Sequence, residues 1–130
     1  MLGKELGEAK GQASSTRLLP FDGGAPQIEA SFTGEGTFLG QKMTLIGSYW
    51  ESFRDGGVRF GDARMLLTLA DGETVFFRGS GVSGQPNRYA SAGDFPWTSP
   101  GLAHLKSVSA VVEYDILEKG GYAWRMWEWR

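Results

Sequence analysis

Polar and apolar residues alternate along two long segments of the chain. In residues 28–38 every even position is apolar or glycine and every odd position is polar. Residues 107–116 show the same alternation, with Val111 as the exception. A period of two predicts β-strands with one buried and one solvated face. We therefore expect the apolar half of each segment to point into a core: Ile28, Ala30, Phe32, Phe38, Val108, Ala110, Val112, Tyr114 and Ile116.

Short turn signals divide the chain into eight such segments. Asp-Gly and Gly-Gly pairs, which recur near residues 22–24, 55–57, 71–72 and 120–121, are typical of hairpins because glycine adopts a positive φ. The segments between the turns are 3–19, 27–38, 41–54, 58–70, 73–83, 88–98, 107–117 and 122–130. Eight strands joined by tight turns predict an all-β fold, an eight-stranded antiparallel meander that closes as a barrel. At 130 residues, the whole chain 1–130 is expected to be one domain.

The opening segment permits two interpretations. Residues 4–13 contain good helix formers, but Gly3, Gly7 and Gly11 would each cost about 1 kcal/mol inside a helix. On a strand the three glycines share one face, where another backbone can approach closely. We favour a long first strand.

One short helical turn is predicted near residues 100–106. Ser99 is a suitable N-cap, and Pro100 suits the first helical position. Leu102 and Leu105 then fall on one side of the turn. This turn is expected to plug one end of the barrel with its two leucines.

The amino-acid composition argues against several classes of function. Hydrophobic residues make up 41% of the chain, and the eight Phe, four Tyr and five Trp are enough to fill a core. A formal net charge of −2 provides neither the basic surface that nucleic acids need nor a polybasic membrane patch. We therefore expect no nucleic-acid partner and no membrane partner.

The first twenty residues argue against a secretory signal. They contain five charged side chains and no apolar stretch of the length that a signal peptide needs. The longest apolar-rich run, residues 65–70, is far shorter than the roughly 20 residues of a membrane-spanning helix. The expected location is the cytoplasm.

Metal and nucleotide sites are also disfavoured. The chain has no cysteine and a single histidine, His104, whereas a metal ion needs three or four ligands. Residues 79–84 spell Gly-x-Gly-x-x-Gly, but the turn-like residues 85–88 follow in place of the helix that a dinucleotide site requires. We expect no metal site and no cofactor.

The candidate chemistry lies near Glu51. If Leu45, Gly47, Tyr49 and Glu51 share the inward face of their strand, a carboxylate and a phenol reach the mouth of an apolar barrel. Glu128, which lies between two tryptophans in the sequence, is a second carboxylate that could occupy such a position. Possible partners of either carboxylate are Arg59, Arg64, Arg78 and Arg125. The alternative is that these charges form cross-strand salt bridges on the outer wall.

A family resemblance adds to this picture. Residues 101–108 and the following Ala110-Val111-Val112-Glu113-Tyr114 resemble a glycine- and leucine-containing signature with a later glutamate in allene-oxide-cyclase-like small barrels, a calycin-type group. Residues 34–40 and 47–50 are similar to that group, and the Trp-Glu-Trp-Arg sequence at 127–130 resembles uncharacterised prokaryotic members. The resemblance implies an eight-stranded barrel, often oligomeric, in which some members bind or cyclise apolar molecules. None of the catalytic residues of the cyclases can be matched here, so the resemblance does not imply their activity.

Three functions stay open. The favoured hypothesis is an apolar small molecule bound in the lumen, where an eight-stranded barrel has room for side chains or one small ligand. The expected ligand-binding residues are Phe32, Phe38, Tyr49, Glu51, Val112 and Tyr114. The second hypothesis is a cyclase- or isomerase-like enzyme with Tyr49 and Glu51 as proton-transfer groups. The third is a structural or assembly protein whose lumen is filled by its own aromatic residues.

The last strand predicts a homo-oligomer, a dimer or a trimer. Tyr122, Trp124 and Met126 occupy one of its faces, and Trp127 and Trp129 occupy the other. One strand of a small barrel cannot bury two aromatic faces unless a second copy or another segment covers the outside.

Overall fold

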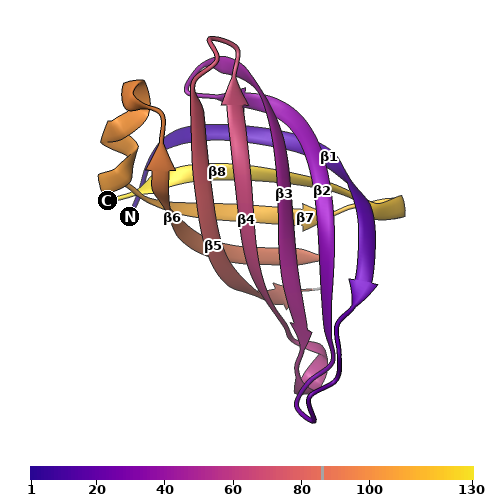
Figure 1. Ribbon diagram of the computed structural model, residues 1–130. Coiled ribbons are helices and arrows are strands. Elements are labelled where there is room, and N and C mark those ends of the chain that lie inside the picture. The colour runs from indigo at the N-terminus through magenta and orange to yellow at the C-terminus, as the bar shows by residue number, and fades with distance from the viewer. Residues whose placement is uncertain (86) are drawn as a thin grey trace.

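The computed structural model describes residues 1–85 and 87–130, which form a closed antiparallel barrel (Figure 1). Each strand pairs with the next along the chain, and β1 pairs with β8 to close the barrel. The strands are β1 (Leu2–Leu18), β2 (Gln27–Phe38), β3 (Gln41–Phe53), β4 (Arg59–Leu69), β5 (Thr74–Gln85), β6 (Arg88–Thr98), β7 (Ser109–Ile116) and β8 (Gly121–Trp129). The eight-stranded meander predicted from the sequence is confirmed.

Short helical turns complete the architecture. They are η1 (Asp55–Gly57), η2 (Pro100–Ser107) and η3 (Glu118–Gly120). Gly56 and Gly72 have φ values of 75° and 88°, which confirms the hairpin signals at these positions. No helix in the described ranges is long and apolar enough to cross a membrane.

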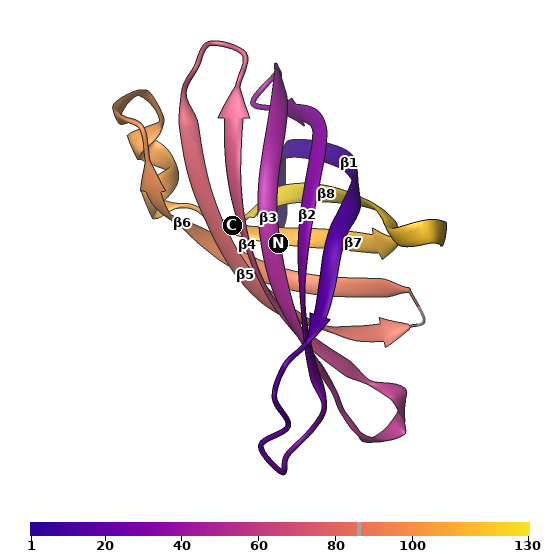
Figure 2. The ribbon, with the colours of Figure 1, turned by 45° about the vertical axis from the view of Figure 1, so that its right-hand side comes forward.

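The first strand closes the barrel by bending around it. β1 pairs with β2 through residues 7–18 and with β8 through residues 2–12 (Figure 2). A Cβ atom at Gly11 would overlap the carbonyl of Thr33 and the hydroxyl of Tyr122. This close approach of backbone and ring explains the glycine, and it confirms the long-strand interpretation.

One end of the barrel is plugged by η2. Leu102 and Leu105 are buried there, as the sequence predicts. Phe95 near the end of β6 is fully buried, and its ring centroid is 6.1 Å from that of Phe38 and 5.4 Å from that of Phe77. Side chains therefore fill this end.

The prediction that the Ser99 side chain caps this turn is wrong in detail. The Ser99 hydroxyl makes no capping hydrogen bond to η2. It bonds to the backbone of Thr74 on β5, with Ser99 Oγ 2.9 Å from the carbonyl oxygen. The neighbouring strand offers a backbone partner, so the side chain ties η2 to the sheet instead.

The inward faces follow the alternation predicted for β2 and β7. Ala30, Phe32, Phe38, Ala110 and Val112 are buried. Ile28, Val108, Tyr114 and Ile116 are half-buried. On β8 the inward face is the one that carries Tyr122, Trp124 and Met126.

The outer wall retains exposed apolar side chains. Ile46, Leu66, Phe76 and Trp97 are cross-strand neighbours in one row over β3 to β6. Within this row Ile46 and Trp97 are 60% and 52% exposed. Trp129 on β8 is also exposed. A contiguous row of exposed apolar side chains is typical of a contact surface.

The homo-oligomer therefore stays a prediction with a defined test. Light scattering at micromolar concentration is expected to give two or three times the 14.2 kDa of one chain. Trp97→Glu and Trp129→Glu would identify which outer surface is covered, because a charge there opposes burial. A mass of one chain for the unmodified protein at that concentration would contradict the oligomer.

Candidate functional site

A chamber of about 70 Å³ lies inside the barrel at the end away from η2. Glu51 near the end of β3, Gly61 near the start of β4 and Tyr89 near the start of β6 all line it. Because η2 follows the other end of β6, the antiparallel strand order places the chamber and η2 at opposite ends. The chamber is therefore the accessible part of the lumen.

Two kinds of residue line the chamber. The aromatic lining consists of Phe32, Tyr49, Phe77, Tyr89, Tyr114 and Trp124. The small residues of the lining come from β4, β5 and β6 and are Gly61, Ala63, Gly79, Gly81 and Ser91. Of these glycines, Gly61 has room for a further side chain, whereas the Phe77 ring already occupies the space beside Gly79.

The strand register brings small residues of the lining together. Glu51 pairs with Gly61, Gly61 pairs with Gly81, and Gly81 pairs with Ser91. At Gly61 an added Cβ would lie 3.4 Å from Cε1 of Tyr89, an ordinary contact distance. This position can therefore accept a side chain that would project toward the lumen.

Glu51 is a buried carboxylate with two partners. It is 4% exposed. The Tyr89 hydroxyl donates to Oε2 at 2.6 Å, and Nη1 of Arg59 donates to Oε1 at 3.2 Å. The Arg59 guanidinium also lies 5.7 Å from the centre of the Tyr89 ring. A buried charge needs compensation of this kind, so the three side chains form one unit.

The sequence left the partner of Glu51 open, and the structure selects Arg59. The outer-wall alternative does not apply to this pair, although it describes other pairs. Arg78 contacts Asp94 at 3.0 Å on the outer wall, and Arg125 contacts Glu5 at 3.2 Å. Glu128 pairs with the exposed Arg130 at 3.0 Å.

All four tyrosines of the chain gather around the lumen. The Tyr114 ring stacks on Tyr122 with centroids 5.4 Å apart, and it meets Tyr89 edge-on at 6.3 Å. Burial, and then the hydrogen bond to Glu51, raises the pKa of Tyr89. Burial, and then the charge of Glu51, raises the pKa of Tyr49. Both phenols therefore keep their protons at neutral pH, and the Tyr89 hydroxyl donates a hydrogen bond to Glu51.

Trp124 contributes a polar group with no partner. Its side chain is 1% exposed and lines the chamber. Its indole Nε1–H is buried and forms no hydrogen bond with any described residue. An unpaired buried donor costs roughly 1–3 kcal/mol, so this group is an unusual feature of a folded core.

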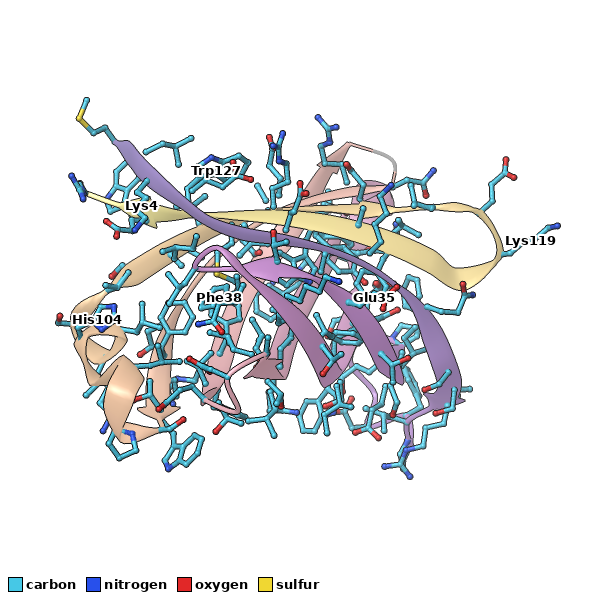
Figure 3. The ribbon with its side chains drawn as sticks, turned by 90° about the horizontal axis from the view of Figure 1, so that it is seen from above. Lys4, Glu35, Phe38, His104, Lys119 and Trp127 are labelled. Atoms are coloured by element: carbon cyan, nitrogen blue, oxygen red, sulfur yellow. The ribbon has the colours of Figure 1, made fainter. Side chains whose placement is uncertain are left out.

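The structure brings five of the six expected ligand-binding residues together. Phe32, Tyr49, Glu51, Val112 and Tyr114 line the chamber. Phe38 does not, because it lies under η2 against Phe95. Figure 3 shows Phe38 on the side of the molecule that carries His104, with Lys119 at the far side. Tyr89 and Trp124 were not assigned to the site from the sequence.

The remaining sequence motifs lie apart from this chemistry. Residues 79–84 belong to β5, which continues to Gln85, and no helix begins there within the described residues. His104 is exposed on η2. No cluster of potential metal ligands occurs in the part of the chain that the structure describes.

A larger hollow of about 1010 Å³ lies on the outer face. Exposed side chains of both signs line it, including Glu8, Lys10, Glu35, Lys42 and Arg125. The hollow is open to solvent and mixed in charge, so the chamber is the better candidate site despite its smaller volume.

No family model matches the chain, and no curated protein matches it. Solved structures do. A beta-barrel like protein from Acinetobacter baumannii has 16% identity and a TM-score of 0.84, covering 98% of this chain and 94% of that one. A protein with unknown function from Clostridium acetobutylicum has 13% identity, a TM-score of 0.82 and 98% coverage of both chains. An enzyme from Penicillium herquei has 16% identity, a TM-score of 0.73 and coverage of 96% and 92%.

At these identities the likeness shows the fold alone. The small barrel expected from the sequence is confirmed. The more specific likeness to allene-oxide-cyclase-like proteins receives no support from the comparisons. The chain is thus similar to small β-barrel proteins, among them proteins of unknown function.

Proposed function

We propose that this barrel binds a small, largely apolar molecule in the chamber at its open end. The observation that carries the proposal is an apolar chamber lined by aromatic rings and small residues, beside one buried polar unit, Glu51–Arg59–Tyr89. Ligand sites commonly combine mostly apolar walls with a few polar groups that fix orientation.

The size of the chamber limits what enters it. Its volume is about 70 Å³, whereas an engineered apolar cavity of about 150 Å³ holds benzene. The chamber therefore receives a small molecule or one end of a larger one. The remainder of a larger ligand would lie at the mouth, where Arg59 and Ile116 are partly exposed.

Catalysis is the second candidate. The buried Glu51 with the Tyr89 hydroxyl at 2.6 Å favours it, and one structural neighbour is described as an enzyme. A cyclase- or isomerase-like reaction would use Tyr49 and Glu51 as its proton-transfer groups. Against this, the Arg59 guanidinium already holds the carboxylate and the phenols keep their protons. Binding is therefore the better-supported function.

A self-filled structural barrel is the third candidate. Phe38, Phe77 and Phe95 do fill the end under η2. The chamber on the far side of these rings is what distinguishes a binding protein from a purely structural one.

Filling the chamber tests the proposal. Gly61→Val adds a side chain where the first added atom has ordinary contacts, and valine suits a strand. Saturation-transfer NMR with methylenecyclopentane as the probe is expected to show binding to the unmodified protein. Binding to Gly61→Val is expected to be at least about tenfold weaker, because overfilling a packed space is unfavourable.

Gly84→Val is the matched control. Gly84 lies in β5, and an added Cβ there meets no atom within 4 Å. This variant is expected to bind the probe as the unmodified protein does. Equal affinity for Gly61→Val and Gly84→Val, with both folded by circular dichroism, would refute binding in the chamber.

A further inference from the structure

We infer that the ligand carries a hydrogen-bond acceptor, a carbonyl or ether oxygen, on its buried end, and that Trp124 Nε1–H donates to it. The inference rests on the proposed function and specifies the chemical class of the ligand. Its basis is that Trp124 lines the chamber and that its indole N–H is buried and has no hydrogen-bond partner among the described residues.

The position of Trp124 explains why the ligand is the missing partner. Trp124 is paired in the sheet with Tyr114 on one side and Ala9 on the other. Its side chain belongs to the inner core and lines the chamber. An indole has a single polar hydrogen and no acceptor, so only an acceptor satisfies it.

Three other donors around the lumen already have partners. The Tyr122 hydroxyl donates to the Thr33 carbonyl at 2.9 Å, and the Tyr89 hydroxyl donates to Glu51. Arg59 donates to the same carboxylate. These groups are paired without a ligand, whereas Trp124 is not.

This arrangement discriminates by chemistry as well as by shape. A hydrocarbon in the chamber leaves the indole N–H unpaired, while a carbonyl compound of the same shape pairs it. Sites that offer a buried hydrogen-bonding group reject analogues that lack its complement. The ligand class is thus a compact apolar ketone, aldehyde, lactone or cyclic ether.

Two probes of nearly the same shape test the inference. Cyclopentanone carries an oxygen where methylenecyclopentane carries a CH₂ group. In ¹H–¹⁵N NMR titrations of the unmodified protein, cyclopentanone is expected to bind about three- to tenfold more tightly. It is also expected to move the indole N–H resonance of Trp124 downfield, whereas the hydrocarbon is not. Trp124→Phe identifies that resonance among the five tryptophans.

The variant also removes the selectivity. Trp124→Phe is expected to bind the two probes with equal affinity. If that variant does not fold, the affinity ratio and the number of shifted indole resonances in the unmodified protein still decide the question.

Failure of the inference and failure of the proposed function look different. If both probes bind equally and Gly61→Val weakens both, the chamber binds ligands but the acceptor inference is wrong. If neither probe binds, the proposed function fails and the inference fails with it.

Discussion

Replacing Phe38 by alanine is expected to lower the free energy of unfolding by about 3–5 kcal/mol. The Phe38 side chain is completely buried, and it packs against Phe95 under η2. Its removal leaves a cavity in the filled end of the barrel, where surrounding rings relax only partly. Urea unfolding followed by tryptophan fluorescence measures the loss.

Two comparisons make this prediction specific. Phe53→Ala, at an exposed position near the end of β3, is expected to change stability by no more than about 0.5 kcal/mol. The milder Phe38→Leu is expected to keep the affinity for methylenecyclopentane, because Phe38 lies outside the chamber. A change in probe affinity in folded Phe38→Leu would show that the two ends of the lumen are not separate.

The second large effect concerns the buried ion pair. Arg59→Met leaves Glu51 buried without its cation, and breaking such a pair costs about 3–5 kcal/mol when it is fully buried. The Arg59 side chain is 25% exposed, so we expect a smaller loss of about 2–3 kcal/mol. Chemical denaturation at neutral pH checks the value.

A double-mutant cycle separates the charge effect from lost packing. Glu51→Gln in the Arg59→Met background removes the uncompensated charge and is expected to recover most of the stability. The outer-wall pair offers a control, since Arg78→Met is expected to cost no more than about 1 kcal/mol. Equal losses for Arg59→Met and Arg78→Met would contradict a special role for the buried pair.

The strands were predictable because their signals are local. Each Asp-Gly or Gly-Gly turn acts through the φ angles of one or two residues, as Gly56 and Gly72 illustrate. The alternation in β2 likewise depends only on which side of a strand each side chain points to. All strand bounds accordingly fall within two residues of the predicted segments.

Depth in the lumen was not predictable from alternation. Phe32 and Phe38 share the inward face of β2, and a ligand-binding role was expected for both. Six residues of strand span about 20 Å, so one lies at the chamber and the other under η2. A period of two predicts which face of the strand a residue occupies, but it does not predict the position of that residue along the barrel axis.

The contacts across the lumen were also beyond the sequence. Glu51 on β3 meets Tyr89 on β6, 38 residues later, because the closed barrel brings these strands face to face. Whether the indole N–H of Trp124 finds a hydrogen-bond partner is decided by the side chains that pack around it from other strands. The sequence signal was weak. That all four tyrosines and Trp124 point into one lumen can be recognised only when the register of every strand is known.

The seam between β1 and β8 also shapes the order in which the fold can form. Leu2 pairs with Trp129, and the backbone N–H of Arg130 donates to the carbonyl of Met1. On a ribosome the hairpins from β2 to β7 can assemble as they emerge, but β1 waits for its second partner until β8 has been made. Contacts this distant in sequence slow folding, because a long loop must close before they form. Until that moment the nascent sheet has two open edges and an uncovered lumen, which is the interval in which it is most exposed to aggregation.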